Sequence, residues 1–180
     1  MQTWQTLSKT TILSHGKYLT VEDHAVQLPN GHTIPDWPFV ITPNYINVLA
    51  LTVDQKAICF RQTKYALGET LAIVGGYLEP GEDPLTAAKR ELLEETGYQA
   101  PHWLNLGHYT LDANRGCGEG YLFLAQGAIL VQSPAADDLE EQHLHLLTLA
   151  ELETALLNNA FKAMSWVATI ALALNHLKAG

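Results

Sequence analysis

The stretch from Gly75 to Tyr98, GGYLEPGEDPLTAAKRELLEETGY, constrains the fold most because it contains signals for both ends of one helix. Asp83 is a favourable N-cap, and Pro84 is favourable as the first helical residue. Gly97 suits the position just after the last turn. The sequence therefore predicts a helix over 84–96. The expected buried face of this helix consists of Leu85, Ala88, Leu92 and Leu93.

Three carboxylates crowd the second half of this predicted helix: Glu91, Glu94 and Glu95. Residues four apart lie on the same side of a helix, so Glu91 and Glu95 share a face, and Arg90 can pair with Glu94. The carboxyl end of a helix carries partial negative charge, which disfavours acids there unless a cation binds. Oxygen donors of this kind favour Mg²⁺, with Mn²⁺ as a second choice. The alternative is a solvated helix face with ordinary surface glutamates.

The residues around these glutamates fall at fixed intervals. Gly76 is followed after five residues by Glu82, and after seven more by the run RELLEETGY, residues 90–98. This pattern resembles the signature box of the Nudix hydrolases over residues 76–98, with Tyr98 where a bulky aliphatic residue is usual. The resemblance implies an α+β fold, the Nudix-type α/β/α sandwich with a mixed central sheet. It also implies an enzyme that cleaves a nucleoside diphosphate linked to another moiety.

The resemblance gives the residues of the box individual roles. It implies that three acids bind the divalent cation: Glu91, Glu94 and Glu95. The resemblance also implies that the carbonyl of Gly75 is a further metal ligand. Glu94, Glu95 and Arg90 are also candidates for catalysis, Arg90 because it orients the glutamates. Glu82 braces the loop, or holds a metal through water at the substrate, and a purely structural role is the alternative for Glu82 and Arg90.

The general base is expected outside the box. In the subgroup that hydrolyses ADP-ribose, a glutamate in a late loop often serves as the base. The acidic loop over 133–142 offers Glu140 and Glu141, of which Glu140 is preferred. Glu119 is a further candidate. The alternative is that the acidic loop is simply solvated.

Features outside the box also resemble the ADP-ribose pyrophosphatase group. A β-rich segment of about 40 residues precedes the core, and FRQTKY, residues 60–65, resembles an element after the second core strand of that group. Trp37 stands where an aromatic side chain stacks on adenine, and Arg61 and Arg115 are expected to contact phosphate. Each has a structural alternative: Trp37 as a core or interface residue, Arg61 in an ion pair, and Arg115 paired with Glu119.

Two segments depart from the pattern of that group. Its members commonly have Glu-x-Pro-Ala-Gly before the box, where this chain has LAIVGG, residues 71–76. Many members have a Ser-Pro-Gly-like loop where this chain has DANRGCGEG, residues 112–120. Both departures concern the choice of substrate rather than the hydrolase chemistry.

The predicted function is therefore Mg²⁺-dependent hydrolysis of the pyrophosphate bond in ADP-ribose or another nucleotide sugar, giving AMP and a sugar phosphate. The alternatives are NADH, a dinucleoside polyphosphate or a damaged nucleotide as substrate, or a nucleotide-sensing Nudix module without catalysis. Residues 1–40 are expected to form a β segment that contributes to a homodimer, with Trp4 and Trp37 facing the partner. Residues 41–180 are expected to form the Nudix hydrolase domain.

Composition excludes other classes of function. The net charge is −9, with ten Lys and Arg residues. This charge disfavours binding to DNA or RNA, because such binding neutralises phosphates with basic side chains. The strongly apolar stretch over 163–174 is shorter than the about 20 residues that cross a bilayer, so no membrane partner is expected. Cys59 and Cys117 form no disulfide framework, which favours a reducing, cytoplasmic setting.

Alternation of apolar and polar residues, together with turn signals, predicts the remaining elements. A strand begins near Tyr18, and the Pro-Asn-Gly at 29–31 predicts a hairpin turn. A Gly-rich loop is expected over 113–120. Further strands are expected at 45–53, 56–62, 71–74, 104–112 and 121–130, a strand or connector at 143–149, and helices at 150–161 and 162–177.

Overall fold

The structure is a computed structural model that describes residues 1–135 and 142–179. The two candidate bases Glu140 and Glu141 lie outside the described residues. The chain divides into two compact units. Unit 1 comprises residues 1–44 and 109–120, and unit 2 comprises residues 45–108 and 121–180.

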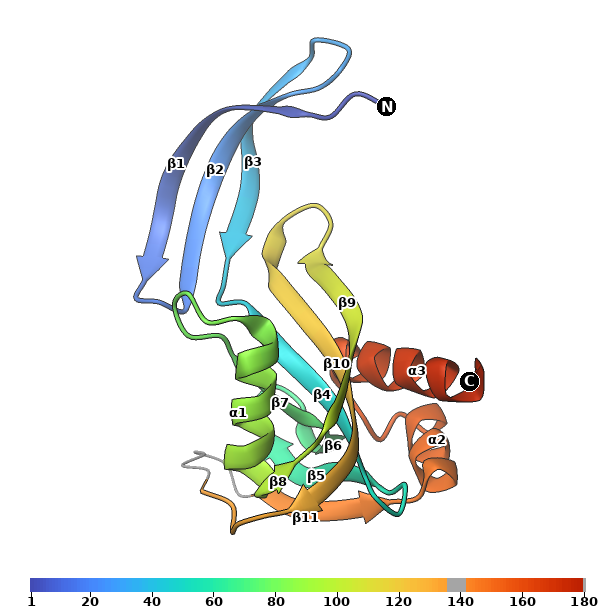
Figure 1. The fold of residues 1–180 in the computed structure, drawn as a ribbon. Helices are drawn as coiled ribbons and strands as arrows, with labels where there is room; N and C mark the ends of the chain where they lie inside the picture. The colour runs from blue at the N-terminus through green and yellow to red at the C-terminus, as the bar shows by residue number, and fades with distance from the viewer. Residues whose placement is uncertain (136–141, 180) are drawn as a thin grey trace. The chain divides into compact units, whose positions relative to one another are not determined.

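Unit 1 is built on an antiparallel sheet of three strands (Figure 1). These are β1 (Gln5–His15), β2 (Leu19–Gln27) and β3 (Thr33–Ile41). The predicted hairpin turn is confirmed, because the Gly31 N–H donates to the carbonyl of Leu28 at 2.9 Å. At the β3 edge of this sheet, Gly116 pairs with Val40 in parallel.

The strand β1 was not expected from the sequence. Every one of its residues is exposed, including Leu7, Ile12 and Leu13. A strand that buries neither face does not need alternating apolar and polar residues, which is the pattern by which a strand is predicted. Among the residues of these three strands only His24 and Val26 are buried, and the His24 ring stacks on Phe39 with centroids 4.7 Å apart.

Unit 2 holds the larger sheet, in which β4 lies beside β10, β5 and β7. β5 pairs in turn with β6 and β11, both antiparallel. The strands wholly within this unit are β4 (Tyr45–Thr52), β5 (Ala57–Lys64), β6 (Gly68–Ala72), β7 (Val74–Tyr77), β8 (Tyr98–Gln99) and β11 (Gln142–Leu147). Two longer strands contribute residues to both units: β9 (His102–Asp112) and β10 (Gly116–Leu130).

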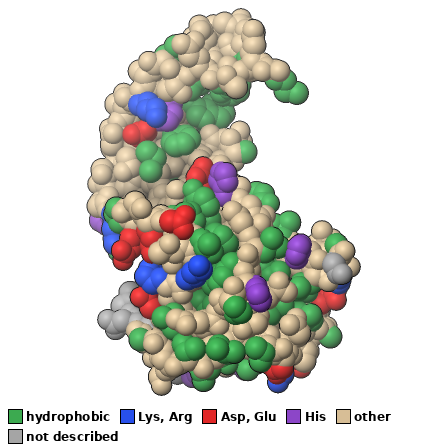
Figure 2. Space-filling model, in the orientation of Figure 1, with side chains coloured by type: hydrophobic (Ala, Val, Ile, Leu, Met, Phe, Trp, Pro, Cys, Tyr) green, Lys and Arg blue, Asp and Glu red, His purple; other side chains and the backbone are tan. Residues whose placement is uncertain are grey.

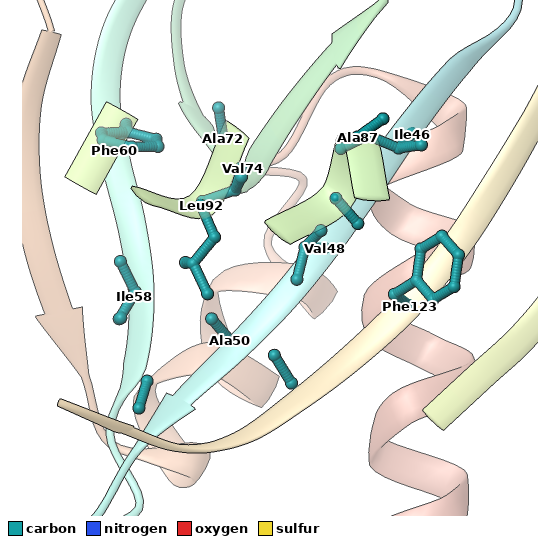
Figure 3. Packing of buried hydrophobic residues seen from close by; sticks show 13 residues of the cluster. Ile46, Val48, Ala50, Ile58, Phe60, Ala72, Val74, Ala87, Leu92 and Phe123 are labelled. Carbon is teal, nitrogen blue, oxygen red and sulfur yellow. The ribbon is translucent and has the colours of Figure 1, made fainter. Parts of the chain in front are cut away.

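Helices pack against both faces of this sheet, which confirms the predicted α/β/α sandwich. They are α1 (Pro84–Thr96), α2 (Leu149–Leu157) and α3 (Met164–Ala179). Residues of β4 point into two separate cores: Ile46 and Val48 pack in one with Leu92 of α1, as Figure 3 shows. Leu49 packs in the other, with Ile170 of α3. Each of these side chains is fully buried. Such burial contributes about 1.5–3 kcal/mol per side chain to the free energy of unfolding.

Several predicted boundaries were wrong. The strand expected at 71–74 is two strands, β6 and β7, separated at Ile73. The helix expected over 150–161 ends at Leu157, because the Asn158 N–H caps the last turn and Asn159 turns left-handed with φ 56°. The last helix spans 164–179 rather than 162–177.

The Gly-rich segment after β9 also differs from the prediction. Instead of a loop over 113–120, a short turn leads into β10 at Gly116. Three successive residues there have a left-handed φ: 81° at Gly116, 61° at Cys117 and 79° at Gly118. Phe39 and Thr42 occupy the space that side chains at the two glycines would need. Glycine is therefore required there by both backbone and packing.

No helix in the described part of the chain is both long and apolar enough to cross a membrane.

Candidate active site

The helix α1 begins and ends where the sequence predicts. Asp83 is the N-cap, and its Oδ2 accepts from the Thr86 N–H at 3.0 Å. Gly97 ends the helix with a left-handed φ of 75°, and its N–H donates to the Leu93 carbonyl at 2.8 Å. The buried side of the helix is slightly rotated from the prediction, since Ala87 is fully buried and Leu93 only half-buried.

Arg90 is the centre of a carboxylate network on α1. It binds Glu82 with two nitrogens, Nε to Oε1 at 2.9 Å and Nη2 to Oε2 at 3.0 Å. Its Nη1 donates to Glu91 Oε1 at 2.8 Å and to Glu94 Oε2 at 3.1 Å. The predicted pairing of Arg90 with Glu94 is therefore present, but Glu82 and Glu91 are closer partners. Figure 2 shows acidic and basic side chains side by side on the face that carries α1.

Partial burial strengthens this network. The side chains of Glu82 and Glu91 are 12% and 14% exposed, whereas that of Glu94 is 49% exposed. The hydrogen bonds from Arg90 lower the pKa of Glu82, and the bond to Glu82 is the main reason that the pKa of Arg90 is raised. A bidentate guanidinium–carboxylate pair is stronger and more directional than a single contact. The network therefore fixes the direction of Glu91 more firmly than that of Glu94.

Glu82 also closes the loop that precedes α1. Its Oε2 accepts from the Glu79 N–H at 3.0 Å, and its own N–H donates to the Glu79 carbonyl at 3.0 Å. Arg90 reaches the same loop through the Tyr77 carbonyl at 3.4 Å. These contacts agree with a bracing role for Glu82, since it binds the backbone of Glu79 in the same loop.

Two glycines bring β7 against the glutamates of α1. The Gly75 N–H donates to Glu95 Oε2 at 3.3 Å. Gly76 lies against Glu91, whose carboxylate fills the space that a Cβ on Gly76 would need. The structure thus brings the backbone of Gly75 to Glu95 and that of Gly76 to Glu91, and the role of the Gly75 carbonyl as a metal ligand stays a prediction. A side chain at Gly76 would displace the carboxylate of Glu91.

The donor chemistry of this site fits a hard divalent cation. Glu91, Glu95 and the Gly75 carbonyl offer oxygen, which is what Mg²⁺ and Mn²⁺ prefer. Within residues 1–135 and 142–179, however, no three His, Cys, Asp or Glu side chains converge on one point. Glu91 and Glu94 both form ion pairs with Arg90 instead. A cation would have to compete with this guanidinium for Glu91.

Arg61 pairs with a glutamate outside this network. Its guanidinium forms an ion pair with Glu69, with Nε 2.5 Å from Oε1. It lines a cavity of about 540 Å³ together with His145 and Lys162, and no α1 residue lines that cavity. The ion pair that the sequence offered as the alternative for Arg61 is therefore the contact observed. Its contact with phosphate stays a prediction.

The remaining candidates belong to unit 1. The Trp37 indole N–H donates to the Asn114 carbonyl at 2.8 Å, and its ring meets the edge of Trp4 with centroids 5.1 Å apart. The Arg115 guanidinium lies 3.5 Å from the carboxylate of Asp112. These contacts explain the local structure of unit 1. The substrate roles of Trp37 and Arg115 stay predictions, as does the role of Glu119 as a base.

One buried polar residue on the strand that pairs with β7 has no counterpart in the predictions. Asn47 of β4 is opposite Gly75 in the strand register and is only 3% exposed. Its place opposite Gly75 depends on the pairing of two segments that are distant in the sequence, and nothing in the residues around Asn47 predicts this pairing.

Comparisons with family models support the sequence resemblance. A model described as "NUDIX domain" matches residues 43–167. A second, described as "Nucleoside diphosphate sugar hydrolase N-terminal domain", matches residues 4–40.

Curated relatives match the chain in part. An ADP-ribose pyrophosphatase of Bacillus subtilis (strain 168) is 40% identical over 97 residues, 53% of this chain and 51% of the relative. A methanol dehydrogenase activator of Bacillus methanolicus is 36% identical over 99 residues, 53% of each chain. The chain thus spans about half the length of the curated relatives it matches. The different names of these relatives leave the substrate open.

A solved structure shares the fold over almost the whole chain. The crystal structure of an ADP compounds hydrolase superposes with a TM-score of 0.84, covering 99% of this chain and 96% of the other. The sequence identity is 22%, so this likeness speaks for the fold alone.

Proposed function

Because this chain belongs to the Nudix family, we propose that it is a hydrolase of the pyrophosphate bond in nucleoside diphosphate derivatives. The preferred substrate is ADP-ribose or another nucleotide sugar, which would yield AMP and a sugar phosphate. The N-terminal match to a nucleoside diphosphate sugar hydrolase domain and the ADP-ribose pyrophosphatase relative support this choice.

The observation that carries the proposal is the network of Arg90 with three glutamates on a loop–helix unit. It holds Glu91 beside Gly76, while Glu95 contacts the backbone of Gly75. Glu91, Glu95 and the Gly75 carbonyl would hold the cation, for which Mg²⁺ is the first choice and Mn²⁺ the second. When bound, such a cation neutralises the diphosphate and lowers the pKa of a bound water.

The residues of this chain then divide the remaining work. Arg90 orients Glu91 and Glu94, and Glu82 anchors Arg90 to the loop. The oxygen of the attacking water forms a bond to phosphorus while the bond from phosphorus to the bridging oxygen breaks. A carboxylate must take the proton that this water loses. Glu140 and Glu141, outside the described residues, are the proposed bases, with Glu119 as a further candidate.

Residues 1–40 are proposed to form a homodimer and residues 41–180 the catalytic domain. The apolar side chains that β1 exposes support the first part: Leu7 is 50% exposed and Ile12 60% exposed. Single exposed apolar residues are common, but several along one strand indicate a protein surface that a partner covers. The two free cysteines are consistent with a reducing compartment, and the cytoplasm is the proposed location.

The direct test is a hydrolysis panel with Mg²⁺ or Mn²⁺, and with EDTA as the blank. It would contain ADP-ribose, ADP-glucose, NADH, diadenosine polyphosphates and 8-oxo-dGTP. Release of AMP and ribose 5-phosphate from ADP-ribose, lost in Glu95→Gln, supports the proposal. Preference for another substrate would keep the chemistry and change the specificity. Tight binding of a substrate without turnover would indicate the nucleotide-sensing alternative.

A further inference from the structure

The cavity that Arg61 lines has the size of a small-molecule site. Its volume is about 540 Å³, and sites for small ligands usually measure about 300–1,000 Å³. Its described lining comes from β5, β6, β11 and the segment over 160–162, all within unit 2. This Arg61 cavity is therefore a candidate for a ligand that the glutamates of α1 do not account for.

The Arg61 cavity and α1 lie on opposite faces of the sheet. Successive residues of a strand point to alternate faces. On β5, Phe60 packs in the core that contains Leu92 of α1. Cys59 packs in the other core, which contains Ile170 of α3. Arg61 follows Phe60 and so shares the face of Cys59, which separates its cavity from the site on α1.

The described lining of this cavity is positively charged. It contains two cations, Arg61 and Lys162, and one carboxylate, Glu69, which leaves one positive charge in excess. The chain as a whole has a net charge of −9. A concave surface lined by cations concentrates anions locally. The ring of His145, also in the lining, can donate a further hydrogen bond.

Lys162 is held in place by neutral groups. Its Nζ donates to the carbonyl of Glu69 at 2.6 Å and to that of Leu67 at 3.3 Å. These contacts use two of the three N–H donors of the ammonium group, and neither carbonyl cancels its charge. Lys162 can therefore offer both a donor and a positive charge to a ligand.

The segment that carries Lys162 is bonded to the backbone and side chains of β6. The Leu71 N–H donates to the Ala160 carbonyl at 2.9 Å, and the Lys162 N–H donates to the Thr70 hydroxyl at 3.2 Å. The Thr70 hydroxyl in turn donates to the Ala160 carbonyl at 3.1 Å. A ligand would lose little free energy in ordering such a cavity, and this favours affinity.

The ion pair of Arg61 with Glu69 is open to competition. Nε and Nη2 of Arg61 both contact Oε1 of Glu69, so Nη1 is not part of the pair. The two side chains are 59% and 62% exposed, and an ion pair this exposed is weak. A phosphate monoester carries a charge of about −1.5 to −2 at pH 7 and can therefore displace Glu69 from the guanidinium.

Apolar side chains supply much of the remaining lining. Leu71, Leu147 and Ala160 lie beside the charged groups. Small-molecule sites usually combine apolar surface of this kind with a few polar groups that fix the orientation of the ligand. The cavity thus fits a molecule with an anionic end and an apolar body.

We propose that the Arg61 cavity is a second binding site, for a phosphate monoester with an apolar or aromatic body. The phosphate would lie between Arg61 and Lys162, and the body against Leu71 and Leu147. Two cations from separate elements suit the charge of a phosphate monoester better than that of a single carboxylate. Such a site would bind its ligand whether or not the site on α1 hydrolyses a diphosphate.

The probe is AMP, because it joins a phosphate monoester to an aromatic base. Its affinity would be measured by calorimetry on the full chain in excess EDTA, beside inorganic phosphate and adenosine as its two halves. EDTA removes the divalent cation through which the site on α1 would hold phosphate. The wild type should bind AMP at least about 10-fold more tightly than either half.

Two variants should change this affinity in opposite directions. Arg61→Gln should weaken AMP binding about 10-fold or more, because it removes charged hydrogen bonds to the phosphate. Glu69→Gln should strengthen AMP binding by up to about fivefold, because it frees the guanidinium from its exposed pair. The matched control is Lys178→Gln, which removes one positive charge from another exposed pair of unit 2 and should bind AMP like the wild type.

Glu95→Gln tests whether AMP is bound at α1 instead. It removes a proposed cation donor and should leave the affinity for AMP in EDTA unchanged. A changed affinity in Glu95→Gln would overturn the second site. Absence of AMP binding by the wild type, equal affinities of the wild type and Arg61→Gln, or an equal loss in Arg61→Gln and Lys178→Gln would overturn it as well. Each of these results leaves the hydrolysis panel with Mg²⁺ as the separate test of the proposed function.

Discussion

The carboxylate of Glu91 occupies the place where a side chain on Gly76 would lie. Gly76 does not have a left-handed backbone, so its requirement for glycine comes from this contact alone. Gly76 belongs to β7 and Glu91 to α1, so this contact joins the strand to the helix that carries the glutamates. The fixed number of residues between Gly76 and Glu91 in the sequence therefore corresponds to a close contact between the two in the fold.

Gly76→Ala should reduce hydrolysis of the preferred substrate at least about 100-fold. The added methyl group must displace the Glu91 carboxylate, and a shift of about 1 Å in a catalytic group can cost that much. The matched control is Gly68→Ala, which strains a left-handed residue (φ 69°) with no neighbour within 4 Å. Gly68→Ala should lower the melting temperature but retain kcat/KM. Activity of Gly76→Ala close to that of the wild type would contradict the assignment of Glu91 to the site.

The Glu82–Arg90 pair should make stability depend on pH in the acid range. Arg90 lowers the pKa of Glu82 in the folded protein. The ion pair therefore contributes fully to the free energy of unfolding above the pKa of a glutamate in the unfolded chain, about 4.3. It is lost as the pH falls through the lower, folded pKa. Glu82→Gln should therefore be less stable than the wild type at pH 7, and the gap should close below about pH 4.

Urea denaturation at several pH values between about 7 and 3 would measure this gap. Glu153→Gln is the control, because it breaks the exposed pair with Lys178. The contribution of such an exposed pair is small at any pH. A gap for Glu82→Gln that stays constant down to the lowest pH would show that the ion pair does not contribute in this way.

Local signals in the sequence were sufficient to predict α1. Asp83, Pro84 and Gly97 act within one turn of the helix they delimit, so their chemistry can be read without knowing the fold. The strand β1 lacks such a signal because it is exposed along its whole length. The glycines at 116 and 118 suggested a loop, yet they permit a strand to begin beside Phe39 and Thr42, which are distant in the sequence.

The site shows the same division. The pairing of Arg90 with Glu94 follows from helical spacing and was predicted. The stronger contact of Arg90 with Glu82 depends on how the loop folds back, and only the family resemblance suggested a bracing role for Glu82. Asn47 was missed altogether, since its place opposite Gly75 arises from the pairing of β4 with β7.

Trp37 should affect substrate affinity more than its neighbour Trp4 does, if it stacks on a nucleotide base. Such stacking is worth about 1–3 kcal/mol, which is about a 5- to 150-fold change in affinity. Trp37→Ala should raise KM by that factor, and Trp37→Phe should restore most of the loss. Trp4→Ala removes the edge contact with Trp37 and is the control. Equal KM values for wild type and Trp37→Ala would leave Trp37 only its structural role beside Asn114.

The two cysteines should differ sharply in reactivity. Cys59 is fully buried on β5, and burial raises the pKa of its thiol to about 12. At pH 8 about one molecule in ten thousand would then carry the thiolate at Cys59, whereas about a quarter of ordinary thiols are ionised. Cys117 is only half-buried. We therefore expect the native protein to react with a thiol reagent at one site, Cys117.

Thiol titration with Ellman's reagent at about pH 8 would count the reactive groups. The native wild type should release one equivalent of chromophore, the denatured protein two, and native Cys117→Ser essentially none.

The unfolded thiol ionises at about pH 8.5 and the folded Cys59 thiol does not, so folding stability should also decline as the pH rises above about 8.5. Cys59→Ala should weaken that decline. Rapid reaction of native Cys117→Ser would show instead that Cys59 reaches solvent, which would require the core that packs on it, with Leu152 of α2 and Ile170 of α3, to open.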